Sequence, residues 1–325
     1  MNVLLTGALG NIGLQTLLAL LQAGHTVKAF DLPSPNNKKV DQRNRLYAKN
    51  HLELIWGDIL DESLLKKSVA GIDAVIHLAA VLPPVSDLNP ELAYTVNVQG
   101  TKKLIQVMEE YAPKARFIFT STVGVNGYQS PWQDNESPVL RTSTDAFNPV
   151  DTYSKHKVEC EKYLRDSNLH WVIMRIGVCF GSEKATKIDL AECRMQFKVS
   201  PNARLEYVHP GDVAIALTNA VTVTDIAGKT LLIGGGEHCQ TTFGQMIQKL
   251  FNGMGISITH DVYGNDNYFT EWLDTTESQR LLNFQSRTLD DMEKEVKARM
   301  RVMRYLLWPF KPMVLPIFKR LIRER

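Results

Sequence analysis

Cysteine is scarce in this chain, which contains only Cys160, Cys179, Cys193 and Cys239 among 325 residues. Their spacing fits neither a zinc site nor a dense disulfide framework, so we expect reduced thiols, no metal centre and a cytoplasmic location. The chain also lacks an apolar run long enough to cross a bilayer. Its first residues enter a predicted strand without a basic, cleavable leader, so secretion is not expected.

A strong excess of one charge is absent as well, because 37 Lys and Arg residues face 35 Asp and Glu residues. The net charge of +2 gives no reason to expect a nucleic-acid partner. The balance is uneven, however, since residues 297–325 carry nine basic residues and one acid. The chain is otherwise 44% apolar and 22% charged, which is typical of a globular protein with ample core.

A glycine-rich turn is the first motif that carries chemistry. A short apolar strand is predicted at residues 3–5, and Gly7, Gly10 and Gly13 follow with the spacing G-x-x-G-x-x-G. An apolar helix is then predicted over residues 14–23. Glycines between a strand and a helix let a pyrophosphate approach the N–H groups at the helix N-terminus. The order therefore predicts a dinucleotide-binding turn.

Further apolar runs bounded by turn residues predict a series of strands, at 26–31, 52–58, 73–80, 116–122, 171–176 and 230–233. Helical stretches separate them, which indicates an α/β fold with a doubly wound parallel sheet of the Rossmann type. Ligands bind at the carboxyl ends of the strands in such sheets. Beyond the sheet, we predict helices over 242–251 and from residue 288 as far as Leu307.

Asp31 ends the second predicted strand. A carboxylate there can accept hydrogen bonds from ribose hydroxyls and repels a 2′-phosphate, so we expect NAD rather than NADP. Lys38, Lys39 and Arg43 lie near enough in sequence to reach a phosphate, which leaves NADP as the less favoured alternative. His77, inside the fourth strand, is predicted to be a packed histidine rather than a ligand or a base.

Tyr153 and Lys157 are four residues apart and fall on one face of a predicted helix. A tyrosine hydroxyl with a pKa of about 10 is a poor base, but a cation beside it favours the phenolate. Lowering that pKa by about 3 units takes roughly 4 kcal/mol. The pair is suited to moving a proton at a secondary alcohol while hydride leaves the carbon.

In this order the motifs resemble those of the extended short-chain dehydrogenase/reductases, the NAD-dependent epimerase/dehydratase family. The resemblance covers about residues 1–235, and the matching segments are Thr-Gly-x-x-Gly-x-x-Gly at 6–13, Asp31, Gly57-Asp58, His77 to Ala80, Asn97-x-x-Gly100-Thr101, Ser121-Thr122, Tyr153-x-x-x-Lys157, Arg175 and Val208 to Ala214.

The resemblance implies a role for each matching residue. The residues implied to hold the cofactor are Gly7, Gly10, Asn11, Ile12 and Gly13 at the pyrophosphate, Asp31 at the ribose, Asp58 and Ile59 at the adenine, and Leu78, Ala79, Ala80 and Asn97 on the nicotinamide side. Tyr153 is implied to transfer the proton, and Lys157 to bind the nicotinamide ribose and lower the pKa of Tyr153. Thr122, which aligns better than Ser121, is implied to hydrogen-bond the reacting oxygen. The alternative for both hydroxyls is a strand-end cap.

These motifs favour an NAD-dependent oxidoreductase that transfers hydride at a secondary alcohol or ketone. An epimerase with tightly held NAD uses the same chemistry, whereas a dehydratase needs a further acid that the sequence 122–124 does not offer. A non-catalytic NAD sensor is the alternative of another class, although both Tyr153 and Lys157 are present. No asparagine follows Arg175 closely, and only about 27 residues separate Gly181 from His209. Both departures weaken a nucleotide-sugar substrate, and the apolar residues 81–85, Val123 and Val125 suit a less polar one. A sugar-like small molecule stays the alternative.

The expected domains and the expected dimer follow from the same family resemblance and from the predicted elements. We expect an NAD-binding domain at 1–177 and 207–235, a substrate subdomain at 178–206 and 236–304, and a homodimer through helices at 95–111 and 153–166. Residues 305–325 are predicted to form a basic amphipathic tail that docks on the inner, anionic membrane surface. Each basic residue near such a surface adds about 1 kcal/mol. The alternatives for the tail are packing on a dimer partner and a frayed terminus.

Overall fold

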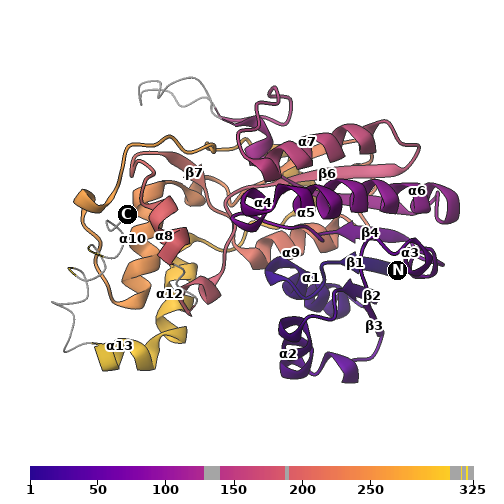
Figure 1. Ribbon diagram of the computed structural model, residues 1–325, viewed down its shortest axis with the longest axis horizontal. Helices are drawn as coiled ribbons and strands as arrows, with labels where there is room; N and C mark the ends of the chain where they lie inside the picture. Colours follow the sequence, from indigo (N-terminus) through magenta and orange to yellow (C-terminus); the bar gives the residue numbers. More distant parts are fainter. Residues whose placement is uncertain (128–139, 187–189, 308–315, 317–319, 321–325) are drawn as a thin grey trace.

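The protein was analysed as a computed structural model, which describes residues 1–127, 140–186, 190–307, 316 and 320. Its centre is a parallel sheet of seven strands in the order β3-β2-β1-β4-β5-β6-β8 (Figure 1). These strands are β1 (Asn2–Thr6), β2 (Thr26–Asp31), β3 (Leu52–Trp56), β4 (Ala74–His77), β5 (Arg116–Thr122), β6 (His170–Ile176) and β8 (Thr230–Ile233). The predicted α/β class and doubly wound parallel sheet are confirmed, and all the predicted strands are found.

Helices cover both faces of this sheet (Figure 1). In the first half of the chain they are α1 (Asn11–Gln22), α2 (Pro35–Asn44), α3 (Glu62–Ser68), α4 (Val85–Leu88), α5 (Pro90–Tyr94), α6 (Thr101–Tyr111) and α7 (Thr152–Arg165). The later helices are α8 (Leu190–Gln196), α9 (Pro210–Asn219), α10 (Phe243–Met254), α11 (Thr276–Leu282), α12 (Leu289–Arg299) and α13 (Arg301–Leu307). Because side chains alternate along a strand, Val3 and Leu5 pack under α1 and α9, and Leu4 packs under α3, α6 and α7.

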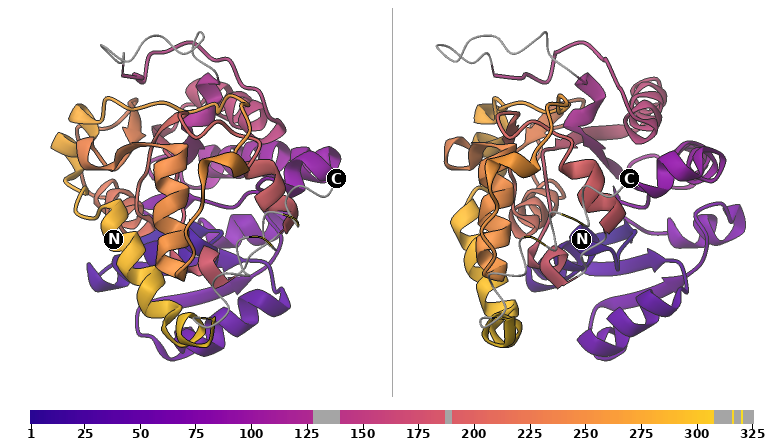
Figure 2. Two further views of the ribbon diagram at one scale, coloured as in Figure 1. Left: turned by 90° about the vertical axis from the view of Figure 1, so that its left-hand side faces the viewer. Right: turned by 60° about the vertical axis from the view of Figure 1, so that its left-hand side comes forward.

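A third apolar cluster lies outside the sheet, around α10 and α12 (Figure 2). It includes the fully buried Met292 and Val296 of α12 and Phe243 of α10. The short antiparallel pair of β7 (Arg204–Glu206) and β9 (Gln240–Thr242) borders it. This cluster is the physical basis for the predicted substrate subdomain, whose boundaries stay a prediction.

The helix containing Asn97 differs from the prediction, which made Asn97 the start of a helix. The chain is already helical in α5, passes through a π-helical segment at Thr95–Gly100 and continues into α6. Asn97 therefore lies inside a continuous helical run. A π-helical turn widens the backbone locally and is frequent at functional sites.

The C-terminal helix also differs, because the predicted helix to Leu307 is broken at Met300. Arg304 of α13 donates to the carbonyl oxygens of Asn252 and Gly253 at the end of α10, at 3.1 and 2.6 Å. A cation is favourable at these free carbonyls, which draws α13 toward α10. Residues 308–315, 317–319 and 321–325 of the predicted tail lie outside the described residues. Within the described part, no helix combines the length and apolar character needed to cross a membrane.

His77 is buried inside the sheet and links three elements, as predicted for a packed histidine. Its Nδ1 lies 2.7 Å from the Thr6 hydroxyl and its Nε2 lies 2.9 Å from the Thr101 hydroxyl. Thr101 donates to the Asn97 carbonyl at 2.6 Å, so it must accept from His77 Nε2–H. Thr6 accepts from the Ala79 N–H, which leaves its hydroxyl hydrogen free to donate to His77 Nδ1. Burial lowers the pKa of His77 to about 3, and the nearby Lys157 charge adds to the effect, so the imidazole is neutral.

This neutral histidine should make folding stability depend on pH. Below the ordinary pKa of 6.5, the unfolded chain binds a proton at His77 that the folded protein does not, so stability falls as the pH falls. The loss from this site is about 2 kcal/mol between pH 7.5 and 5.0. Urea unfolding of wild type and His77→Gln at both pH values measures it. The variant should lose less stability over this range, and equal losses in the two proteins would contradict the assignment.

Candidate functional site

The glycine turn between β1 and α1 is packed too closely for other residues. Gly7 has a φ of 67°, and a Cβ there would lie 2.8 Å from the backbone nitrogen of Ala79. A Cβ on Gly13 would lie 2.1 Å from the Gly7 carbonyl oxygen. Both contacts require glycine, because any side chain would separate the turn from β4 or from α1. The turn is therefore held beside the carboxyl end of β4, as a dinucleotide-binding turn requires.

The N-terminus of α1 is open to an anion. Gly10 is the N-cap and supplies no side-chain acceptor, so the free N–H groups of the first turn remain available. Asn11 is exposed at the first helical position, whereas Ile12 is half-buried against the core. Backbone N–H groups and the helix dipole at such a terminus suit a pyrophosphate.

Asp31 lies at the end of β2 beside this turn. Its carboxylate accepts from the backbone N–H groups of Leu9 and Leu32, both at 2.8 Å, and from the Asn37 amide at 3.0 Å. Burial raises the pKa of Asp31, and these three hydrogen bonds oppose the rise. The contact with Leu9 ties the end of β2 to the glycine turn, so the two predicted cofactor positions are brought together.

Asp58 and Ile59 follow β3 and point in different directions. Asp58 is exposed and accepts from the Leu60 N–H at 3.0 Å, while Ile59 is only 5% exposed. The Ile59 side chain packs on Gly100, where a Cβ would approach it to 2.7 Å. The Ile59 side chain is therefore core, and only its backbone can serve the adenine role that the resemblance implies.

Asn97 is committed to the loop after β4. Its side chain accepts from the Val81 N–H at 2.7 Å and donates to the Val81 carbonyl at 2.9 Å. This two-point contact holds the chain just after Leu78, Ala79 and Ala80, all of which are half-buried. Asn97 thus fixes the backbone of the loop that the resemblance assigns to the nicotinamide side, with its own amide already occupied.

Tyr153 and Lys157 share one face of α7, as predicted. The Lys157 ammonium lies 5.4 Å from the centre of the Tyr153 ring and 4.6 Å from that of Phe119, and it donates to the Thr120 carbonyl at 2.7 Å. Burial lowers the pKa of Lys157 to about 8. The predicted lowering of the Tyr153 pKa is not found, because burial raises that pKa and the charge of Asp151 raises it further.

Ser121 and Thr122 are successive residues of β5, so their side chains point to opposite faces of the sheet. Ser121 is 3% exposed and donates to buried Glu161 at 2.6 Å, so its hydroxyl is structural. Thr122 is half-buried and accepts from the Gly124 N–H at 3.1 Å, which is the strand-end cap considered from the sequence. That contact uses an oxygen lone pair and leaves the Thr122 hydroxyl hydrogen as a donor. A Cβ on Gly124 would lie 2.6 Å from the Ser154 hydroxyl oxygen, so Gly124 joins Thr122 to the start of α7.

Glu161, which the sequence analysis missed, anchors α7 to the sheet. It is fully buried and pairs with Arg175 of β6 through two hydrogen bonds of 3.0 and 2.8 Å. It also accepts from Ser121 of β5, and Arg165 lies 3.3 Å from it. In the sequence, Glu161 lies about two helical turns after Tyr153, which indicates that an acidic side chain shares the inward face of this helix. The network fixes Tyr153 relative to Thr122.

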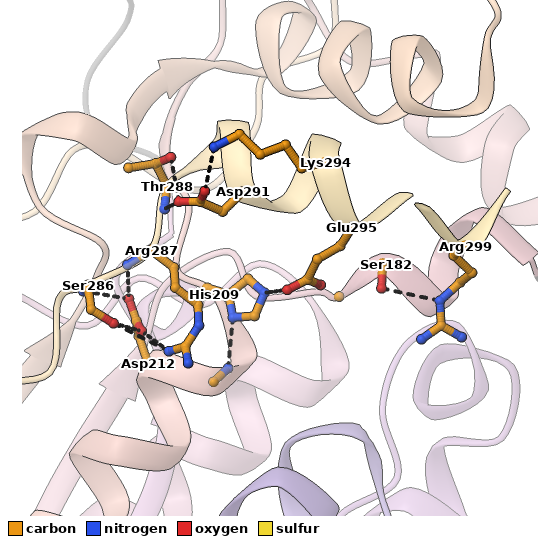
Figure 3. A network of polar contacts seen from close by, with 12 residues as sticks. Ser182, His209, Asp212, Ser286, Arg287, Thr288, Asp291, Lys294, Glu295 and Arg299 are labelled. Carbon is orange, nitrogen blue, oxygen red and sulfur yellow. Dashed lines mark hydrogen bonds and ion pairs between the residues drawn. The ribbon is translucent and has the colours of Figure 1, made fainter. Parts of the chain in front are cut away.

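Asp212, within the matched motif at 208–214, ties α9 to the C-terminal segment (Figure 3). It is fully buried and accepts from the backbone N–H groups of Ser286 and Arg287 and from both side chains. In the same network, His209 accepts from the Gly211 N–H at 3.0 Å and lies 3.2 Å from Glu295 of α12. The motif thus holds the third apolar cluster against the sheet.

The packing of two valines corrects the expectation that they face the substrate. Val123 and Val125 are buried core residues, so they do not line a substrate site. A hollow of about 830 Å³ lies elsewhere, between β9, α10 and the start of α12, and none of the predicted site residues lines it. Cys160, Cys179 and Cys239 are free thiols. In the described part of the chain, no three His, Cys, Asp or Glu side chains gather as metal ligands would.

Comparisons with known proteins agree with this geometry. A family model described as "NAD dependent epimerase/dehydratase family" matches residues 3–234. The chain belongs to this family. Its curated relatives include a D-erythronate dehydrogenase of Haemophilus influenzae, 32% identical over 51% of this chain and 50% of the relative. They also include a 3-beta-hydroxysteroid dehydrogenase of Mycolicibacterium neoaurum, 32% identical over 51% of this chain and 43% of the relative.

These matches span about half the length of the curated relatives, or less. Among solved structures, the UDP-glucuronic acid 4-epimerase of Bacillus cereus, in complex with UDP-glucuronic acid and NAD, covers 93% of this chain and all of its own, with a TM-score of 0.73 and 22% identity. At that identity the likeness shows the fold of the epimerase/dehydratase family alone.

Removing the anchor of α7 in this family member should be costly. Glu161→Ala leaves the buried Arg175 and Ser121 without their acceptor, and we expect a loss of about 3–5 kcal/mol in the free energy of unfolding. Glu159→Ala is the matched control, because it removes from the same helix only partly exposed contacts, an ion pair with Lys102 and a hydrogen bond from the Tyr94 hydroxyl. The control should lose at most about 1 kcal/mol. Similar losses for both variants in urea unfolding would refute the anchoring role.

Proposed function

We propose that this chain binds NAD across the glycine turn and transfers hydride between the nicotinamide and a secondary alcohol or ketone. The observation that carries the proposal is the placement of Tyr153 and Lys157 on one face of α7, whose first turn meets Gly124 just after Thr122. Lys157 reaches the carboxyl end of β5 at the Thr120 carbonyl, and the turn that is open to an anion follows β1 at the same edge of the sheet. Bound NAD supplies the hydride acceptor or donor for this chemistry.

The side chains then have separate tasks. Tyr153 exchanges the proton with the substrate oxygen, and Thr122 donates a hydrogen bond to the same oxygen. Lys157 carries its charge below pH 8 and binds the nicotinamide ribose. Because burial raises the pKa of Tyr153, the phenol form prevails, and this form donates a proton to a carbonyl oxygen. In the reverse direction, alcohol oxidation, the same oxygen accepts the proton.

The cofactor proposed is NAD rather than NADP. The Asp31 carboxylate is fixed by Leu9, Leu32 and Asn37 at the place where the adenosine ribose would lie. Two ribose hydroxyls can donate to it, whereas a 2′-phosphate would meet its negative charge. The substrate subdomain at 178–206 and 236–304 would close the other side of the cleft formed by 1–177 and 207–235.

An NAD-dependent epimerase without net redox change is the second candidate. The family description and the 4-epimerase structure favour it, since they combine the same fold with that chemistry. An epimerase would be purified with bound NAD and would turn over without added cofactor. A non-catalytic NAD sensor has no need of Tyr153 and Lys157, and the retention of both residues speaks against it.

Replacing the phenol tests the reaction directly. Tyr153→Phe removes the transferable proton and should lower kcat by about 100-fold or more, with little change in NAD affinity. Turnover is followed by NADH absorbance across a panel of secondary alcohols and ketones, and NAD binding by calorimetry. Near-normal kcat in the variant would refute the assignment of Tyr153.

We also propose that the protein acts in the cytoplasm as a homodimer and touches an anionic membrane through residues 305–325. Leu88 is 81% exposed next to the helices at 95–111 and 153–166, which favours an apolar pairing surface there. At the C-terminus, Tyr305 is 84% exposed at the start of a segment rich in basic residues. Charge and exposed apolar surface together suit an anionic lipid surface.

Deleting residues 305–325 distinguishes the proposed membrane contact from the proposed dimer contact. Wild type should co-sediment with vesicles of phosphatidylglycerol but not of phosphatidylcholine, and the truncated chain should bind neither. Sedimentation velocity should give a dimer for both proteins. A monomeric truncated chain would instead place the tail at the dimer interface, and equal vesicle binding would remove the membrane proposal.

A further inference from the structure

A segment far from Tyr153 in the sequence crosses the carboxyl edge of the sheet. Residues 266–274, called the strap here, run from the third apolar cluster toward β5 and β8 (Figure 1). Leu273 of the strap packs with Val123 and Leu232, which follow β5 and end β8. The strap therefore packs on the carboxyl ends of β5 and β8, next to Thr122 in the chain.

Hydrogen bonds and ion pairs hold the strap at its start. The Asp266 N–H donates to the Lys198 carbonyl at 2.9 Å, and the Asp266 carbonyl accepts from the Ser200 N–H at 2.9 Å. Glu271 forms a largely buried ion pair with Arg204, at 2.7 Å. These contacts tie the strap to the β7 region.

The end of the strap is held equally firmly. Buried Glu206 accepts from the Leu273 N–H at 2.9 Å. The backbone of Arg141 pairs with Trp272 and Asp274 on the other side, at 2.8 and 2.9 Å. A segment fixed at both ends can hold a side chain in one position, as a specificity element requires.

The side chain held in this way is Phe269. A Cβ on Gly124 would lie 3.4 Å from two atoms of the Phe269 ring and 2.6 Å from the Ser154 hydroxyl oxygen. Phe269 is therefore in van der Waals contact with the turn between Thr122 and α7. Its ring is backed by Tyr268, with ring centres 5.0 Å apart, and it remains half-buried.

We propose that Phe269 is the aromatic wall of the substrate site, and that it selects a ring presenting a continuous C–H face. The inference rests on the proposed function, because it takes the space beside Tyr153 and Thr122 as the substrate site. An aromatic face packs well on C–H groups and poorly on hydroxyls, which it cannot hydrogen-bond. Both a polyol ring and a hydrocarbon ring carry such a face, so the wall accounts for a ring substrate of either polarity.

Binding to the NAD-loaded protein tests the wall. The probes are myo-inositol as a polyol ring, cyclohexanol as a hydrocarbon ring, and 2-butanol as a secondary alcohol without a ring. In wild type, saturation-transfer NMR should show magnetisation passing from aromatic protons to ring C–H protons of at least one cyclic probe. Phe269→Leu should raise the Kd of that probe about tenfold and leave those of 2-butanol and NAD unchanged.

Two matched variants control for indirect effects. Phe269→Tyr keeps the aromatic ring, so its Kd for the cyclic probe should be close to that of wild type. Tyr47→Leu removes an exposed aromatic residue before the amino end of β3, and it should leave the Kd of every probe unchanged. The polyol and hydrocarbon arms show which kind of ring is the substrate. Failure of both cyclic probes to bind wild type, or an unchanged Kd in Phe269→Leu, overturns the wall. Ring binding that depends on Phe269 without any NADH formation would leave the wall standing and reject the proposed reaction.

Discussion

The buried pairing of Glu161 with Arg175 is the interaction on which the rest of the site depends. It joins α7 to β6, and the Ser121 hydroxyl extends it to β5. A buried ion pair contributes little net stability when complete, but it penalises every arrangement that separates its partners. The pair therefore fixes the position of α7, which carries Tyr153 and Lys157, relative to the carboxyl end of β5.

Burial also sets the charge state of the site. The same desolvation that lowers the pKa of Lys157 to about 8 raises the pKa of Tyr153, because each charged form loses its hydration. His77 is kept neutral for the same reason, and its two hydrogen bonds join the glycine turn to the helix that carries Asn97. The end of β1, where the glycine turn begins, and the helical run that carries Asn97 are thus connected through uncharged groups.

Two buried carboxylates that follow β6 hold distant segments of the chain in place. Asp212 fixes the segment that leads into α12, and Glu206 fixes the strap that carries Phe269. Both carboxylates are buried, and each accepts from two backbone N–H groups as well as from side chains, which is a rigid form of attachment. Phe269 and the pair of Tyr153 and Lys157 stand on separate elements that meet at Gly124.

The sequence by itself determined the strands of the sheet and the place of the glycine turn between the first strand and the first helix. Glycine spacing, apolar strands and the placement of Asp31 and Tyr153 are local patterns, and a parallel sheet necessarily gathers strand ends at one edge. Only the tertiary structure decided which distant groups meet, such as Glu161 with Arg175 and Phe269 with Gly124. It also decided that Val123 is core and that the pKa of Tyr153 rises. Burial and contact between distant residues depend on how the elements pack, which no local pattern records.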